Sequence, residues 1–123
     1  MSLESLIKQK KAKVAVIGLG YVGLPTALEL AKTGFRVFGI DVKKERVDKV
    51  NRGLSFIFDV SADELKRAVR SKKLKAFNRH LPLKNADIVL ICVPTPWIRI
   101  KFPISLILKI PSGKLPDIYI KIS

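Results

Sequence analysis

Three glycines at fixed spacing give the clearest chemical signal in the sequence. Gly18, Gly20 and Gly23 form the pattern G-x-G-x-x-G directly after the apolar run at residues 13–17. Between a strand and a helix, such glycines allow a tight turn, a close approach of a pyrophosphate to the backbone, and tight packing of the helix on the strand. Free N–H groups at the start of that helix favour phosphates. The pattern predicts a dinucleotide-binding turn.

An acidic residue at the end of the next predicted strand supports this interpretation. Asp41 follows the third glycine by 18 residues, which is close to the spacing at which a carboxylate accepts hydrogen bonds from the adenosine ribose. Its charge would repel the additional phosphate of NADP, so we predict NAD as the cofactor. The alternative is structural: the glycines only shape a turn, and Asp41 only ends a strand.

The elements needed to position these residues alternate along the chain. Short apolar runs at 13–17, 35–41 and 86–93 are typical of strands buried on both faces, and 73–77 favours a further short strand. Helical spacing of apolar residues predicts helices at 21–34 and 43–53, each ending at a glycine. Ser61 and Glu64 have the spacing of a capping box and predict a third helix. This alternation predicts an α/β fold of the Rossmann type, with a doubly wound parallel sheet.

Composition limits the remaining possibilities. With 123 residues and a formal charge of +14, the chain has room for one domain and carries a large basic excess. We interpret the basic clusters as solvated helix faces and expect no nucleic-acid partner, although a basic nucleic-acid binder is an alternative that the charge leaves open. No uncharged run of 18 residues occurs, so we expect no membrane partner. The single cysteine suits a reducing cytosol, so we expect a cytoplasmic location.

Two other side chains could do chemistry and are not assigned a role in it. Cys92 is the only cysteine and lies in an apolar run, where a thiol usually packs inertly. His80 has no acid or thiol partner evident from the sequence, and we place it on the surface or in a loop. We therefore assign no catalytic residue and no metal ligand.

The sequence resembles the NAD-binding domain of the UDP-glucose/GDP-mannose dehydrogenase family over about residues 1–96. The resemblance lies in two motifs, GLGYVGLP at 18–25 and VPTP at 93–96. The stretch GLSFIFDVSADELKRAV at 53–69 is more similar to members that act on UDP-N-acetylhexosamines than to those that act on UDP-glucose.

The resemblance implies further site residues and a reaction. The backbone at Tyr21 and Val22 would lie against the pyrophosphate, and Val93, Pro94 and Thr95 would line the cofactor cleft. Family members oxidise the C6 alcohol of a UDP-sugar to a carboxylate with two NAD molecules and a catalytic cysteine. That cysteine, the substrate domain and the homodimer contacts belong to later parts of the family's chain, so we expect a UDP-sugar partner only in a full-length relative.

The segment after Pro96 departs from the family pattern. Residues 97–123 contain eight isoleucines, and the family's leucine after VPTP is replaced by Trp97. Moving the reading frame back one base permits a polar loop followed by an amphipathic helix, as family members have. We therefore expect an incomplete NAD-binding domain at 1–96 and an irregular, poorly ordered, out-of-frame tail at 97–123. The alternatives are a free-standing NAD-binding sensor or regulatory module, and a native tail whose segment DIYIKI at 117–122 forms a strand.

Overall fold

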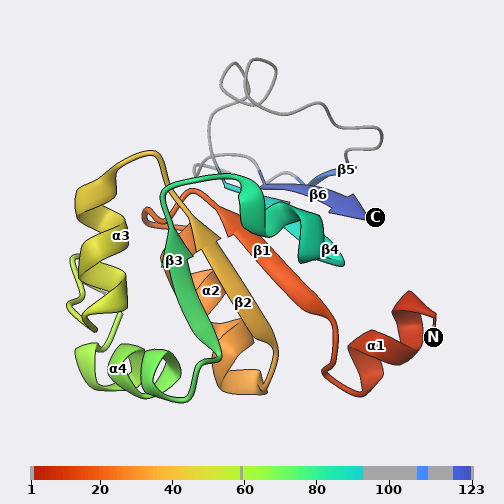
Figure 1. Ribbon diagram of the computed structural model, residues 1–123, viewed down its shortest axis with the longest axis horizontal. Helices are drawn as coiled ribbons and strands as arrows, with labels where there is room; N and C mark the ends of the chain where they lie inside the picture. The colour runs from red at the N-terminus through yellow and green to blue at the C-terminus, as the bar shows by residue number, and fades with distance from the viewer. Residues whose placement is uncertain (1, 59, 93–107, 111–117, 123) are drawn as a thin grey trace.

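A parallel sheet with helices packed on it forms the centre of the computed structural model, which describes residues 2–58, 60–92, 108–110 and 118–122. The sheet begins with four strands, β1 (Lys13–Ile17), β2 (Arg36–Ile40), β3 (Leu74–Phe77) and β4 (Ile88–Ile91). They lie in the order β3-β2-β1-β4 and are parallel (Figure 1). This is the first part of the usual Rossmann strand order, and the Rossmann-type fold predicted from the sequence is confirmed.

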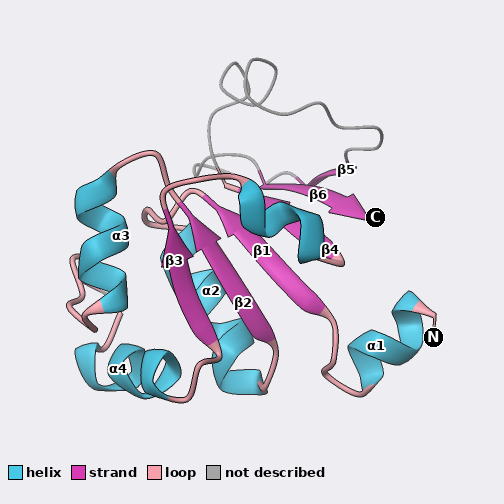
Figure 2. Cartoon of the chain, in the orientation of Figure 1, coloured by secondary structure: helices cyan, strands magenta, loops and turns pink. Residues whose placement is uncertain are grey.

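One face of the sheet carries three helices, α2 (Gly23–Thr33), α3 (Lys44–Asn51) and α4 (Ala62–Arg70). Leu24, Leu28, Val50 and Leu65 from these helices join strand residues in one buried cluster. The helix-spaced apolar residues of the sequence therefore face the sheet, as predicted. Figure 2 shows α2 behind the strands, with α3 and α4 beside the edge strand β3.

A smaller cluster lies on the opposite face of the sheet. Ile17, Ile40 and Ile91 are buried there with Val89. The connection from β3 to β4 contributes only the short 3₁₀ helix η1 (Leu81–Asn85), which contacts β1. The crossover on this face is therefore brief compared with the helices that cover the other face.

The first helix, α1 (Leu3–Lys8), was not among the predicted elements. Ser2 caps it, since its hydroxyl oxygen accepts a hydrogen bond from the Ser5 N–H at 3.2 Å. The chain leaves α1 through Lys10, which has a φ of +57°, and enters β1 soon afterwards.

A side chain completes the outer edge of the sheet at β3. The Asn51 amide donates to the Ala76 carbonyl at 3.0 Å and accepts from the Ala76 N–H at 2.8 Å. This pair of hydrogen bonds has the pattern that a neighbouring strand would provide. Asn51 thereby ties the end of α3 to the edge strand.

Two further strands lie within the segment that begins at Trp97. Strand β5 (Leu108–Ile110) and strand β6 (Ile118–Ile122) extend the sheet in the order β4-β6-β5, and both pairings are antiparallel. Strand β6 falls on the segment DIYIKI, where the alternative of a native tail predicts one. The predicted poor order of residues 97–123 concerns mainly residues outside the described part and stays a prediction.

Candidate dinucleotide site

Two of the three glycines are required by the fold itself. Gly18 has a φ of +94°, a conformation that favours glycine, and its N–H donates to the Ile40 carbonyl at 2.7 Å. At Gly23, a Cβ atom would overlap the carbonyl oxygen of Gly18. The predicted roles of Gly18 in a tight turn and of Gly23 in close packing are therefore visible in the backbone.

Gly20 differs from both, because no atom of the described residues requires glycine there. Its φ is not in the left-handed region, and a Cβ atom would meet only Nη1 of Arg46, at an ordinary 3.6 Å. Among the described residues, only the end of the Arg46 side chain lies within 4 Å of that position. An absent side chain at this point leaves room for a ligand to approach the main chain, as a pyrophosphate would require.

The start of helix α2 points donors toward the same turn. Val22 is the N-cap residue and provides no side-chain cap. Among the described residues, the N–H groups of Tyr21, Val22 and Gly23 have no hydrogen-bond acceptor, whereas the Leu24 N–H donates to the Gly20 carbonyl at 3.1 Å. The Tyr21 side chain is exposed. These N–H groups and the positive end of the helix dipole suit an anion.

Asp41 anchors the glycine turn to the end of β2. Its side chain is only 4% exposed, and Oδ2 accepts from the Leu19 N–H at 2.8 Å. Oδ1 accepts from the Lys43 N–H, also at 2.8 Å. Asp41 therefore has a structural role, which the sequence analysis named as the alternative to ribose binding. Oδ2 also accepts from Arg46 Nη1 at 3.4 Å, so the remaining capacity to accept from a ribose hydroxyl lies on Oδ1.

Sequence reasoning missed Arg46, which lies beside Asp41. Its Nη1 is 3.4 Å from Asp41 Oδ2, and its guanidinium carbon lies 5.8 Å from the centre of the Phe56 ring. Arg46 occupies the first turn of α3, which begins shortly after Asp41 at the end of β2. Its position five residues after Asp41, on the helix that starts at the same sheet edge, is the signal that could have identified it.

Cys92 sits under this site without the properties of a nucleophile. The residue is 8% exposed, and burial raises the pKa of its thiol to about 11. A protonated thiol at neutral pH suits the packing role predicted for it. His80 is exposed at the start of η1, which agrees with its predicted surface position.

Three predicted residues lie outside the described part of the chain, namely Val93, Pro94 and Thr95. The described residues contain no group of three His, Cys, Asp or Glu side chains that could hold a metal ion. They also contain no helix long and apolar enough to cross a membrane.

The fold and the site together define a dinucleotide-binding domain. The glycine turn, the helix N-terminus and the acidic residue all lie at the carboxyl ends of β1 and β2, next to the point between β1 and β4 where the strand order reverses. In doubly wound sheets, ligands bind at this edge. The room over Gly20 and the N–H groups of α2 fit an NAD pyrophosphate.

Comparisons with known proteins specify the family. The NAD binding domain of the UDP-glucose/GDP-mannose dehydrogenase family matches residues 12–105. The chain therefore belongs to this family and carries its NAD-binding domain. The match extends nine residues beyond Pro96, whereas the resemblance seen in the sequence ended there.

Individual relatives agree with the family match. The UDP-N-acetyl-D-mannosamine dehydrogenase of Pyrococcus horikoshii is 41% identical over 85 residues, which are 68% of this chain and 20% of that protein. The enzyme of the same name from Methanococcus vannielii is 43% identical over 97 residues, covering 74% of this chain and 21% of that protein. The solved structure of the P. horikoshii enzyme superimposes with a TM-score of 0.63 at 40% identity, over 68% of this chain and 20% of that one. The chain thus spans about a fifth of the length of these relatives.

Proposed function

We propose that this chain is the N-terminal NAD-binding part of a nucleotide-sugar dehydrogenase that oxidises the C6 alcohol of a UDP-sugar to a carboxylate. NAD accepts hydride in such a reaction. The observation that carries the proposal is the glycine at position 20, which the packing of the described residues does not require. The relatives named for UDP-N-acetyl-D-mannosamine favour a UDP-N-acetylhexosamine as the sugar.

The site residues act as a cradle in this proposal. The main chain at Gly20, Tyr21 and Val22 holds the pyrophosphate, and Gly18 and Gly23 fix the turn. Asp41 accepts from the adenosine ribose, and the guanidinium of Arg46 lies where it can approach either group. Val93, Pro94 and Thr95 would complete the cleft on the side of β4.

The chain by itself is proposed to be inactive as a dehydrogenase. Its only thiol is Cys92, which is buried and protonated at neutral pH. In the family, the catalytic cysteine and the substrate domain follow later in the chain, and so do the homodimer contacts. The proposal includes no nucleic-acid or membrane partner and a location in the cytoplasm.

We further propose that residues 97–123 are translated out of the family's reading frame. The isoleucine-rich composition and Trp97 support this origin. Restoring one base after the Pro96 codon should continue the chain into a second domain with a cysteine in a glycine-rich context. A stop codon within a few codons of that frame would contradict it.

The cofactor site is tested by calorimetric titration of the purified chain with NAD. The Gly20→Ala variant should keep its thermal midpoint, because the added Cβ meets only the end of a flexible arginine. It should bind NAD about tenfold more weakly or worse, because that Cβ occupies the space needed by the pyrophosphate. Lys49→Ala, a change at an exposed residue of α3, is the control and should bind NAD like the parent. Unchanged affinity in Gly20→Ala would contradict the proposed site.

A free-standing NAD-binding sensor or regulatory module is the second candidate. One observation favours it: β6 pairs with β4 over four registered residue pairs, from Ile88 with Ile122 to Ile91 with Tyr119. A tail selected to complete the sheet would form such a ladder. Protease resistance of residues 97–123 in solution would support this candidate over an out-of-frame tail.

A further inference from the structure

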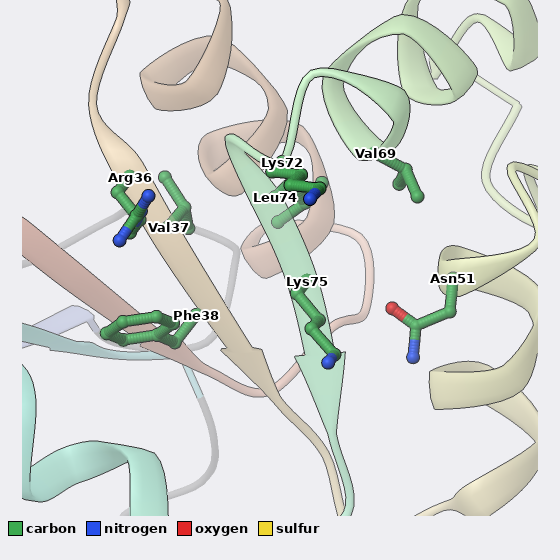
Figure 3. A pocket seen from close by; sticks show the side chains of 8 residues that line it. All are labelled: Arg36, Val37, Phe38, Asn51, Val69, Lys72, Leu74 and Lys75. Atoms are coloured by element: carbon green, nitrogen blue, oxygen red, sulfur yellow. The ribbon is translucent and has the colours of Figure 1, made fainter.

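A cavity lies at the opposite end of the strands from Asp41. It has a volume of about 590 Å³, within the range of small-molecule sites. Figure 3 shows its lining side chains around the starts of β2 and β3, with α3 and α4 alongside. The cavity is lined by eight residues: Arg36, Val37, Phe38, Asn51, Val69, Lys72, Leu74 and Lys75.

The charged residues of this lining all have the same sign. Arg36 opens β2, Lys75 lies within β3, and Lys72 lies in the turn between α4 and β3. None of the eight lining residues is acidic. Three cations from separate segments around one cavity produce a positive potential, which favours an anionic ligand.

The main chain of Leu74 provides a further donor. Ala76 directs its N–H and C=O away from β2, toward Asn51. Because residues two apart in a strand direct these groups the same way, Leu74 also points its N–H away from β2. Leu74 as a whole residue is 1% exposed, and it lines the cavity. No described residue accepts this N–H.

Lys72 holds a conformation that favours glycine. It follows the C-cap residue Ser71 with a φ of +62°, and the Lys72 and Lys73 N–H groups donate to the Val69 and Ala68 carbonyls. Helix α3 ends with the same hydrogen bonds, but the equivalent residue there is Gly53, with a φ of +72°. A lysine at this position strains the backbone.

The strain alone indicates no ligand, since Lys10 at the end of α1 has a similar φ of +57°. At Lys72 the strained backbone coincides with a cationic cavity and a main-chain donor that no described residue accepts. Phe38, which lies on the face of the sheet opposite the helices, adds an apolar surface to that cavity. The site thus combines positive charge with a surface that a flat apolar group could contact.

We propose that this cavity is a second binding site, which takes a small phosphorylated molecule with a planar apolar group. The phosphate would contact Arg36, Lys72 and Lys75 and accept from the Leu74 N–H, and the planar group would lie against Phe38. The site is independent of the NAD site and does not rest on the proposed function.

The test is a titration of the isotope-labelled chain with phenyl phosphate, followed by amide chemical shifts in NMR spectra. NAD is kept saturating, so that the glycine turn is filled. Saturable shifts are expected at Lys72, Leu74 and Lys75. Inorganic phosphate and benzyl alcohol are tested separately and should bind more weakly, because each lacks one half of the proposed ligand. Absence of saturable shifts, or equal affinity for inorganic phosphate, would overturn the proposal.

Variants make the test specific to this cavity. Arg36→Met and Lys75→Met should each weaken phenyl phosphate binding by about tenfold, through loss of a charge-assisted contact. Lys72→Gly should weaken binding while raising the thermal midpoint by about 2–4 °C, since it relieves the backbone strain. Lys49→Met is the control and should bind like the parent. Full affinity in all three cavity variants would contradict the assignment.

Discussion

Asp41 performs a structural task that a surface ribose acceptor would not. Its carboxylate is almost fully buried and holds the Leu19 and Lys43 N–H groups at 2.8 Å. Arg46 approaches it at 3.4 Å and is the more exposed partner, at 35%. Since exposed side chains move easily, we expect Arg46 rather than Asp41 to adjust when a cofactor arrives.

The first prediction concerns cofactor preference. The parent chain should bind NAD more tightly than NADP, because the Asp41 carboxylate repels the additional phosphate. In Asp41→Ser that charge is absent, and Arg46 becomes available to pair with the phosphate. The ratio of NAD to NADP affinity, measured by calorimetry, should therefore fall by about tenfold.

This variant also loses two buried acceptors, so the affinity ratio is the proper measure. A destabilisation of about 2–3 kcal/mol is expected from the unsatisfied N–H groups. The paired control is Asp48→Ser, a change at an exposed α3 residue that should leave the ratio unchanged. A parent chain that binds NADP as tightly as NAD would contradict the prediction.

The second prediction concerns the reactivity of Cys92. Burial raises its pKa from 9.0 to about 11, so the thiolate fraction at pH 8 falls about 100-fold relative to an ordinary thiol. Alkylation by iodoacetamide should be slower by at least that factor in the folded chain. In denaturant the same residue should react at an ordinary rate. Rapid alkylation of the folded chain would show that the site is open.

The raised pKa of Cys92 also makes the free energy of unfolding depend on pH. Because the folded state disfavours the thiolate, its contribution to the free energy of unfolding is fully present below pH 9. This contribution is lost as the pH rises from 9 through about 11.

Single residues differ in how far the sequence predicted their roles. Gly18 and Gly23 were predicted because backbone sterics alone require glycine in that turn. Arg46 was missed because its role depends on the angle at which α3 leaves β2, which the pattern of charges along 43–53 does not encode. The roles assigned to Val93, Pro94 and Thr95 stay predictions.

Helix α4 forms only the serine half of its predicted capping box. The Ser61 hydroxyl accepts from the Glu64 N–H at 3.4 Å, as a capping box requires. The Glu64 carboxylate, however, contacts Lys32 Nζ at 3.0 Å. The acidic member of the motif therefore connects α4 to α2.

The third prediction follows from that cap. Ser61→Ala should lower the free energy of unfolding by about 1 kcal/mol, since it removes an acceptor for an N–H of the first turn. Ser61→Asn keeps an acceptor and should stay close to the parent. Chemical denaturation of the three proteins measures the difference. Equal loss in both variants would show that the serine acts through something other than the cap.

The elements that sequence analysis missed are short. Helix α1 spans six residues and η1 spans five. Over so few residues, apolar periodicity gives little signal, and stability depends on contacts with the rest of the chain. The longer α2 and α3 were predicted from the helical spacing of their apolar residues, and α4 was predicted from the capping-box spacing of Ser61 and Glu64.

The sheet as a whole is that of the first part of a dinucleotide-binding domain. Four parallel strands end at β4, and the strand beside β4 is antiparallel. No sequence pattern predicted the pairing of β6 with β4, because antiparallel pairing depends on where the chain returns rather than on local composition. The segment DIYIKI indicated only a strand.

The fourth prediction is that the purified chain has no dehydrogenase turnover with UDP-sugars. The only thiol is buried, and loss of a nucleophile typically costs several orders of magnitude in rate. NADH absorbance is measured with UDP-N-acetyl-D-mannosamine and UDP-glucose, and a full-length relative serves as the positive control. NADH production above the no-enzyme rate would contradict the prediction.

The fifth prediction is that deletion of residues 97–123 leaves the thermal midpoint of the remaining chain unchanged. A tail that was not selected as protein sequence contributes little matched packing. A native tail would bury large apolar side chains, each worth about 1.5–3 kcal/mol. Calorimetric melting of both chains decides between them. A clear fall in the midpoint would favour the sensor module.

The amide of Asn51 on β3 bears on how the chain behaves at high concentration. Open sheet edges recruit strands from other molecules and thereby start aggregation. Because Asn51 occupies both main-chain groups of Ala76, an incoming strand finds no continuous ladder on this side of the sheet. Among the described strands the other edge is β5. The structure describes no side chain that occupies the main-chain groups of β5 in this way. Self-association should therefore begin at the end of the sheet where the family resemblance stops.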